Sequence, residues 1–423
     1  MTTSAVIRPL APSEETFARA GVYMGYAVRV SGSLDVAALA AAYQAVVRAH
    51  PVLGARLEPA DGEGFDLVAA SAGTPGITVV DGDEDQLVHG PEFDQRTVLS
   101  HVSVVRDGDT ADVTLFTHHS IADACHSLAV LAELWSCYTD VVTGRSPERE
   151  VRPYPVPVEE LLAQRGIEKR AWPVPAGPQA AEQAAVEPVV APPAVAAAPV
   201  GGGRHVPPLV ARCHLSVDET AALVELGHRE GVTINGLVSA AILLSDAEIR
   251  GLPLTEMIYL YPVDLRTRLT PAVGTTDGTN LLGAARYLPA AGTTGLVELG
   301  RSICASLAAA IAEGVVQQTP LHVPEKSTAG VTPPPGMLLV TNWGRVPAPR
   351  MPRGLRATDF RSVLTSAPGP HHPSGGACVI STFGGRLSIE IHHTEAVAPQ
   401  QRQRADSISA RLRGALAQLD PPR

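Results

Sequence analysis

Apolar and polar positions alternate with two different periods along the first part of the chain, and the change of period marks strands and helices. Residues 21–31 alternate with a period of two, which predicts a strand. Apolar residues then recur at helical spacing between a helix start at Asp35 and a stop at Pro51. Residues 102–106 and 113–117 predict a hairpin, because an Asp-Gly turn separates them.

The same criteria predict a long helix after this hairpin, over residues 124–142, and a second set of elements in the rest of the chain. In that second set, Ser216 and Glu219 form a capping box, and Thr233 caps another helix. The expected strands are 213–215, 257–261, 337–343, 377–383 and 386–392, and the expected helices are 222–226, 236–249, 294–312 and 399–419. Helices and hairpins with few strand–helix–strand repeats predict an α/β protein of two sandwiches rather than one doubly wound sheet.

The composition shifts most clearly over residues 172–208, where Ala, Pro, Val and Gly dominate. Proline at this density breaks helices and sheets, and the stretch has no periodic apolar face. We therefore expect an interdomain linker here. It divides the chain into an N-terminal half, residues 1–171, and a C-terminal half, residues 209–423.

Composition and charge exclude several classes of function. The chain has 423 residues, of which 45% are hydrophobic, and a formal net charge of −10. No block of five or more like charges occurs, so we do not expect nucleic acid as a partner. Only Lys169 and Lys326 are lysines, and neither lies in a phosphate-binding loop, which excludes a P-loop nucleotide site.

The sequence also favours a soluble protein of the cytoplasm. The N-terminal residues contain no apolar region of a secretory signal, and no apolar run reaches the roughly 18 residues that a membrane span needs. The five cysteines are scattered and never form C-x-x-C. Reduced thiols are therefore expected rather than a disulfide framework or a cysteine zinc site.

The histidine doublets His118-His119, His371-His372 and His392-His393 are the candidates for chemistry. The first lies between a predicted strand and the long helix, where α/β folds place reacting groups, and Asp123 follows it closely. A histidine that acts as general base must be held in one tautomer, and a carboxylate at the helix N-terminus can fix its loop. The spacing alone leaves open that Asp123 is only a helix cap and that both histidines are polar strand-end residues. We assign no role to the second doublet, and a structural role suits the third better than a place in a channel.

Residues 117–123 have the sequence Thr-His-His-Ser-Ile-Ala-Asp, which resembles the HHxxxDG signature of the condensation-domain and CoA-dependent acyltransferase superfamily. Within it, the chain is more similar to the polyketide-associated acyltransferases of the phthiocerol/phthiodiolone dimycocerosyl transferase type. The similarity extends over both halves, at residues 4–8, 50–53, 162–167, 261–266 and 280–285. One departure is Ala124, which replaces the glycine of the signature and is easily accommodated if that residue is helical.

The resemblance implies two α/β sandwich domains similar to chloramphenicol acetyltransferase, with the active site in a channel at their interface. It implies His119 as the general base, His118 as a supporting residue and Asp123 as a structural one. Arg266 is a candidate partner of Asp123, because a bidentate arginine–carboxylate pair would tie the second half of the chain to the catalytic loop. The alternative for Arg266 is a surface position after a strand.

Asn342 and Trp343 lie at the end of a predicted strand, where the superfamily lines its channel. Asn342 is a candidate donor to the oxyanion, and Trp343 a candidate wall for the acceptor. The alternative, a turn with an ordinary core tryptophan, remains open on the sequence alone.

The implied activity is O-acyl transfer from a thioester, carried by CoA or by an acyl carrier protein of a polyketide synthase, to a hydroxyl of a polyketide-type acceptor. The thioester is a co-substrate, and no cofactor, metal or covalent acyl-enzyme is expected. Because lysine is scarce and the net charge is negative, contact with a CoA phosphate or a carrier protein would come from a local arginine patch. We expect a monomer without a membrane span.

Other functions remain as alternatives. An acetyl-CoA-dependent acetyltransferase that tailors an actinobacterial antibiotic macrocycle would use the same residues. An amide-forming condensation enzyme normally works beside carrier domains, and a non-catalytic carrier-binding module would normally have lost His119. A zinc hydrolase is disfavoured because H-E-x-x-H is absent, and a serine hydrolase because G-x-S-x-G is absent.

Overall fold

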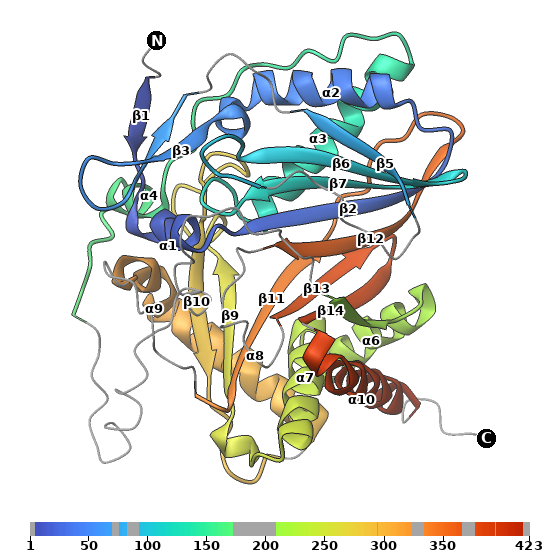
Figure 1. Cartoon of the computed structure of the whole chain (residues 1–423). Helices are drawn as coiled ribbons and strands as arrows, with labels where there is room; N and C mark the ends of the chain where they lie inside the picture. Colours follow the sequence, from blue (N-terminus) through green and yellow to red (C-terminus); the bar gives the residue numbers. More distant parts are fainter. Residues whose placement is uncertain are drawn as a thin grey trace.

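The computed structural model has two lobes, each built on a β-sheet that is covered by helices (Figure 1). It describes residues 5–69, 76–82, 93–171, 209–293, 295–323, 334–365, 377–393 and 395–417. The linker expected over residues 172–208 and the doublet His371-His372 lie outside the described residues.

The upper lobe in Figure 1 contains a five-stranded sheet of order β12-β2-β7-β6-β5. Its strands are β2 (Tyr23–Gly32), β5 (Ile77–Asp81), β6 (Ser100–Asp107), β7 (Thr110–His118) and β12 (Leu355–Thr365). The helices α2 (Val36–Ala49) and α3 (Ala124–Val142) pack against one face and bury a shared apolar core. Both helices begin where an aspartate side chain, Asp35 or Asp123, accepts a hydrogen bond from a first-turn N–H.

A small antiparallel sheet and a short helix complete this lobe. The sheet has the order β1-β4-β3, with β1 (Val6–Pro9), β3 (Arg56–Pro59) and β4 (Phe65–Val68). Helix α1 (Pro12–Ala20) follows β1 directly, and Figure 1 shows it at the boundary between the lobes, near the ends of β9 and β10. Helix α4 (Val158–Ala163) also lies on this side of the molecule.

The lower lobe contains a six-stranded sheet of order β10-β9-β11-β13-β14-β8. Its strands are β8 (Leu209–His214), β9 (Ile258–Asp264), β10 (Leu282–Tyr287), β11 (Met337–Arg345), β13 (Ala377–Phe383) and β14 (Arg386–His393). Its helices are α6 (Val217–Glu230), α7 (Ile234–Arg250), α8 (Leu296–Ala312), α9 (Val315–Gln318) and α10 (Ala398–Ala417). Short 3-10 turns occur at Pro51–Gly54, Leu254–Glu256, Thr319–His322 and Glu395–Val397.

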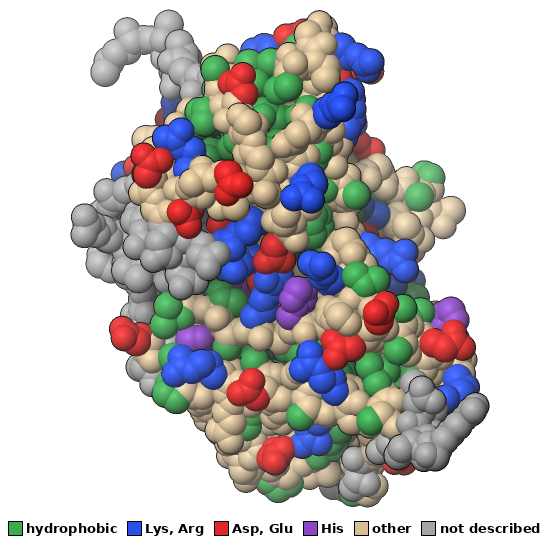
Figure 2. Space-filling model, turned by 90° about the vertical axis from the view of Figure 1, so that its right-hand side faces the viewer, with side chains coloured by type: hydrophobic (Ala, Val, Ile, Leu, Met, Phe, Trp, Pro, Cys, Tyr) green, Lys and Arg blue, Asp and Glu red, His purple; other side chains and the backbone are tan. Residues whose placement is uncertain are grey.

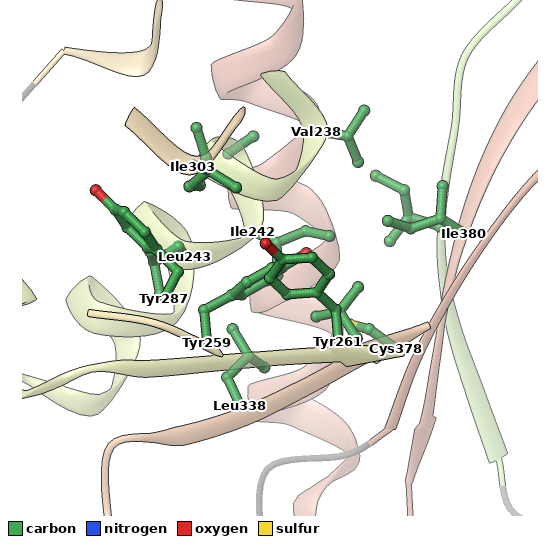
Figure 3. Packing of buried hydrophobic residues seen from close by; sticks show 14 of the residues in the cluster. Val238, Ile242, Leu243, Tyr259, Tyr261, Tyr287, Ile303, Leu338, Cys378 and Ile380 are labelled. Carbon is green, nitrogen blue, oxygen red and sulfur yellow. The ribbon is translucent and has the colours of Figure 1, made fainter. Parts of the chain in front are cut away.

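The core of the lower lobe lies between the sheet and helices α7 and α8. Figure 3 shows Ile242 and Leu243 of α7 and Ile303 of α8 above Tyr259 and Tyr261 of β9. All five side chains are buried. Their burial fixes α7 and α8 on one face of the sheet. The ends of β9 and β10 face the upper lobe (Figure 1).

Strand β12 connects the lobes, because it lies in the sheet of the upper lobe although it comes late in the chain. It comes from the second half of the chain, yet it pairs antiparallel with β2 from Leu355↔Gly32 to Thr365↔Tyr23. The next strand, β13, returns to the lower sheet between β11 and β14. The first sheet therefore contains residues from both halves of the chain.

Charge on the surface is mixed. Figure 2 shows Lys and Arg side chains gathered near the middle of one face, with Asp and Glu side chains among them. Several of the described arginines have carboxylate partners, such as Arg29 with Asp112 and Arg212 with Asp359.

Within the described part of the chain, no single helix is both long and apolar enough to cross a membrane. Two bent helix pairs, α6 with α7 and α8 with residues 315–322, satisfy the length and composition criteria only when each pair is taken together.

The predicted elements agree closely with the structure. The strand at β2, the hairpin β6–β7, the hairpin β13–β14 and the helices α2, α3, α6, α7, α8 and α10 are confirmed. The prediction of two α/β sandwiches is confirmed as well. Among the elements that the pattern did not predict are α1, β10 and β12.

Candidate active site

The loop of residues 118–123 lies where β7 ends and α3 begins. His118 is the last residue of β7, paired with Tyr23, and the backbone N–H of His119 still donates to Val22 O (2.8 Å). The loop then turns, and Asp123 caps α3 by accepting from the N–H of His126 (3.0 Å). The side chain of His119 thus leaves the backbone just past the end of the central strand, at the boundary of the lobes.

Two contacts hold the imidazole of His119. Its Nδ1 lies 2.8 Å from Asn280 Oδ1, and the ring stacks on Phe17 with a centroid distance of 4.0 Å and an interplanar angle of 3°. Asn280 Nδ2 donates to the carbonyl oxygen of His119 (2.6 Å). Because a carbonyl oxygen only accepts, the amide oxygen is the atom that faces the ring, and Nδ1 must carry the hydrogen. The lone pair of the neutral ring is therefore on Nε2, to which no described group donates a hydrogen bond.

Burial lowers the pKa of His119 below its ordinary value of 6.5, because it disfavours the charged imidazolium. The nearby Asp123 carboxylate and the hydrogen bond to Asn280 oppose part of this effect. The ring is consequently neutral at neutral pH, and a proton taken up on Nε2 would be stabilised by Asn280 and Asp123. These are the properties that a general base requires.

Asp123 and Arg266 form a bidentate pair inside the molecule. Arg266 Nη1 donates to Oδ2 (2.8 Å) and Nη2 donates to Oδ1 (3.0 Å), and both residues are buried. The N–H of Leu281 also donates to Oδ2 (2.9 Å). Burial opposes the charge of Arg266, but the attraction of Asp123 outweighs it and raises the pKa of the guanidinium. The structure thus joins the helix cap to the lower lobe at the place where the sequence analysis put a candidate pair.

A segment of the lower lobe, residues 278–281, follows the loop of residues 118–123 closely. His126 Nδ1 lies 3.0 Å from Gly278 O, and the N–H of Asp123 donates to Thr279 O (2.9 Å). With the bonds of Asn280 and Leu281 described above, each of the four residues contacts this loop or the first turn of α3. The two lobes therefore meet in a hydrogen-bonded seam, and His119 lies within it.

The ring of His118 makes its described contacts within the upper lobe. Its ring is fully buried and meets Tyr23 edge-on (4.7 Å between centroids), while its Nδ1 accepts from the N–H of Ser120 (3.2 Å). Burial, and secondarily the charge of His119, lower the pKa of His118 to about 3. The ring is therefore neutral at neutral pH and supports the turn, and a supporting role of His118 in the reaction stays a prediction.

The chain is similar to known proteins over most of its length. A family described as "Phthiocerol/phthiodiolone dimycocerosyl transferase C-terminus" matches residues 204–392. The phthiocerol/phthiodiolone dimycocerosyl transferase of Mycobacterium bovis (strain BCG / Pasteur 1173P2) is 36% identical over 421 residues, which cover 94% of each chain. That of Mycobacterium leprae (strain TN) is 37% identical over 413 residues, covering 94% of this chain and 95% of the other. The chain belongs to this family. It is thus an acyltransferase of the polyketide-associated type.

Solved structures agree with the family assignment. The structure of polyketide synthase associated protein 5 from Mycobacterium tuberculosis is similar with a TM-score of 0.81 and 33% identity, covering 99% of this chain and 100% of that chain. The first condensation domain of the CDA synthetase has a TM-score of 0.65 at 16% identity, covering 99% of both chains, and it shares the fold. The expected family and fold are therefore confirmed.

The other predicted residues lie in different surroundings. Asn342 is exposed, donates to Asn235 Oδ1 (2.7 Å) and accepts from the N–H of Gly344 (2.7 Å). Trp343 is half-buried and packs on Tyr26, with 4.8 Å between ring centroids. Among the described residues, no hydrogen bond or ring contact joins either of them to His119, and their roles as oxyanion donor and acceptor wall stay predictions.

The third doublet and the departure from the signature can be placed as well. His392 and His393 are buried in β14, and His392 Nε2 lies 2.8 Å from Ser362 Oγ. Ala124 is the first residue of α3, and no described non-glycine residue has a positive φ. The alanine at the glycine position of the signature is therefore helical and unstrained.

Phe17 and Asn280 hold the ring of His119, and neither was predicted as a site residue from the sequence. Phe17 lies on the unpredicted helix α1, and no local pattern links it to a histidine so far along the chain. Asn280 lies within a segment that was noted for family similarity. Asn280 lies two residues before β10, a strand that the pattern did not predict, so the sequence offered no signal beyond that similarity.

Proposed function

We propose that the chain transfers an acyl group from a thioester donor, acyl-CoA or an acyl carrier protein, to a hydroxyl of a polyketide-type acceptor, with His119 as the general base. The observation that carries this proposal is the fixed tautomer of His119. With Nδ1–H bound by Asn280, Nε2 is left as a proton acceptor without a described partner. The names of the curated relatives support an acceptor of polyketide origin.

The chemistry requires one proton to move twice. Nε2 of His119 removes the proton from the acceptor hydroxyl, and the oxygen attacks the carbonyl carbon of the thioester. The tetrahedral intermediate then collapses, the carbon–sulfur bond breaks, and the imidazolium returns the proton to the leaving thiolate. The products are an ester and a free thiol. The acyl group moves directly from sulfur to oxygen, so no covalent acyl-enzyme is needed.

Asp123 supports this cycle without contacting the ring. Its carboxylate is occupied by Arg266, by Leu281 and by the first turn of α3. Its negative charge still favours the imidazolium that forms after proton transfer. We therefore assign Asp123 and Arg266 to positioning and to long-range charge stabilisation.

The experiment measures the rate at which the purified full chain releases free thiol from the donor. Acetyl-CoA and longer acyl-CoAs are incubated with simple alcohols or with amines, and the rate is compared with that of His119→Ala. We expect release with alcohols and a loss of about 10²-fold or more in the variant, as for removal of a general base. His228→Ala, at an exposed histidine of α6, is the matched control and should retain the rate.

Release that persists in His119→Ala would contradict the assignment of the base. Release with amines alone would replace ester formation by amide formation. If neither acceptor supports release from CoA, an acyl group loaded on a carrier protein is the second donor to test, and failure of both donors would overturn the proposed transfer.

A further inference from the structure

The carboxylate of Glu14 on α1 is completely buried, and both halves of the chain donate hydrogen bonds to it. Arg8 Nη1 donates to Oε2 (2.7 Å) and Arg8 Nη2 to Oε1 (2.8 Å). The backbone N–H of Ala11 donates to Oε2 (2.9 Å). The fourth donor is the hydroxyl of Thr279, which lies 2.7 Å from Oε1 and comes from the lower lobe.

This burial exceeds what a helix cap needs. A carboxylate at the third position of a helix commonly binds an N-terminal N–H while it remains in contact with water. Removing a carboxylate from water costs several kcal/mol, and the interactions inside must offset that cost. At Glu14 the hydroxyl of Thr279 supplies the only described hydrogen bond that reaches the carboxylate from the seam of the two lobes.

Helix α1 also contacts the loop of residues 118–123. Phe17 stacks on His119, and Ser120 Oγ donates to the carbonyl oxygen of Glu14 (2.8 Å). Glu14 and Phe17 are three residues apart, so their side chains share one face of the helix. One turn of α1 therefore touches His119 itself and Thr279, the residue before Asn280.

Thr279 transmits the position of α1 to Asn280, because the two residues are adjacent in the chain. The backbone of Thr279 is held as well, since its N–H donates to Val156 O (3.1 Å) and its carbonyl accepts from the N–H of Asp123 (2.9 Å). We propose that Glu14 is a positioning residue, which acts through the Thr279 hydroxyl to hold the Asn280 carboxamide against Nδ1 of His119. This inference rests on the proposed function, in which His119 is the base.

A purely structural role for the Glu14–Arg8 pair is the competing explanation, and Thr279 separates the two. Thr279→Val replaces the hydroxyl by a methyl group of similar size and leaves Glu14, Arg8 and Ala11 unchanged. Thr279→Ser keeps the hydroxyl and serves as the conservative rescue. Glu15→Gln is the matched control on α1, because Glu15 contacts Phe65 N and Arg19 and makes no described contact with residues 278–281.

The experiment measures the pKa of His119 by NMR titration of the histidine ring protons, assigned with His119→Gln. It also measures kcat and KM for thiol release from an acyl-CoA with a simple alcohol. The titratable groups that influence this ring are His118 and Asp123, with Arg266 bound to the latter, and all variants leave them intact.

We expect Thr279→Val to lower kcat by about tenfold with little change in KM, as for a slightly misplaced catalytic group. The pKa of His119 should fall in the same direction as in Asn280→Ala, because the bond that favours the protonated ring is weakened. Thr279→Ser and Glu15→Gln should resemble the unmodified chain. In the Asn280→Ala background, Thr279→Val should have no further effect on kcat, since both act through one contact.

The proposal is overturned if Thr279→Val leaves both kcat and the His119 pKa unchanged, or if its effect multiplies with that of Asn280→Ala. A loss of thermal stability with an unchanged pKa likewise assigns Glu14 a structural role alone. The NMR titration needs no turnover, so it decides the role of Glu14 even if the acyl-transfer proposal fails.

Discussion

At the residue scale, the chemistry of His119 depends on one carboxamide. The Asn280 amide fixes its own orientation by donating to the His119 carbonyl, and it thereby fixes the tautomer of the ring. A backbone carbonyl would also accept from Nδ1–H. The Asn280 side chain differs from such a carbonyl because it comes from the other lobe. The base is therefore correctly oriented only while the two lobes are docked.

The pH dependence of activity tests this arrangement. A general base works in its neutral form, and burial lowers the pKa of His119. We therefore expect the acid limb of kcat/KM to lie below pH 6.5, the ordinary value for histidine. Asn280→Ala removes an interaction that favours the protonated ring, so the acid limb should move to lower pH, and kcat should fall by about 10²-fold because orientation is lost.

Asn280→Asp should move the acid limb in the opposite direction. A carboxylate at the same place favours the imidazolium and raises the pKa of His119. Parallel pH profiles of the two variants and the unmodified chain provide the measurement. Shifts of equal sign in both variants would be inconsistent with a hydrogen bond between residue 280 and Nδ1.

At the element scale, the N-terminus of α3 is fixed by a buried ion pair between lobes. Arg266→Ala leaves the Asp123 carboxylate buried with its arginine removed, and we expect a loss of about 3–5 kcal/mol in the free energy of unfolding. Turnover should fall as well, because Asp123 no longer fixes the loop of His119. Chemical denaturation and thiol release measure the two effects.

Arg268→Ala is the control for that prediction. Arg268 is exposed, and its Nη1 donates to Asp264 O (2.9 Å) without reaching Asp123. It should change neither stability nor turnover appreciably. Unchanged turnover and stability in Arg266→Ala itself would show that the pair has no part in positioning His119.

The elements that were predicted from the sequence are those whose conformation follows from local patterns in their own residues. Helix α3 and helix α7 have an apolar face and a side-chain cap, Asp123 or Thr233, so local rules suffice. Strand β12 was missed because charged residues interrupt its apolar positions. Its residue Asp359 pairs with Arg212 of β8, a partner far away in sequence, and only the docked lobes make that position favourable.

The candidate site divides in the same way. The local signature was enough to select His119 and Asp123, and the expectation of a bidentate arginine–carboxylate pair suggested Arg266. Asn280 was not selected because its partner is 161 residues away in the chain. A contact across the seam of the two lobes leaves no periodic pattern in the sequence, so the hydrogen bond between Asn280 and His119 becomes visible only when the fold is known.

At the scale of the whole molecule, the two lobes are not independent units. Strand β12 belongs to the second half of the chain and completes the sheet of the first half. Glu390 of β14 adds a buried link, since its Oε2 accepts from the N–H (2.7 Å) and the hydroxyl (2.6 Å) of Ser362 in β12. The first lobe therefore has an incomplete sheet when the second half of the chain is missing.

This interlocking predicts the behaviour of a divided chain. If residues 1–171 and 209–423 are coexpressed as separate polypeptides with an affinity tag on the first, the second should copurify with it in equal amounts. The reason is that β12 supplies the pairing edge of β2, while Arg266 and Asn280 supply partners for Asp123 and His119. The complex should also retain thiol release, because every described contact of His119 lies within these two pieces.

Deletion of residues 355–365 from the second piece is the matched control and should abolish copurification. Recovery of the tagged piece alone and folded, with the intact second piece present, would show that the lobes associate only through their covalent connection.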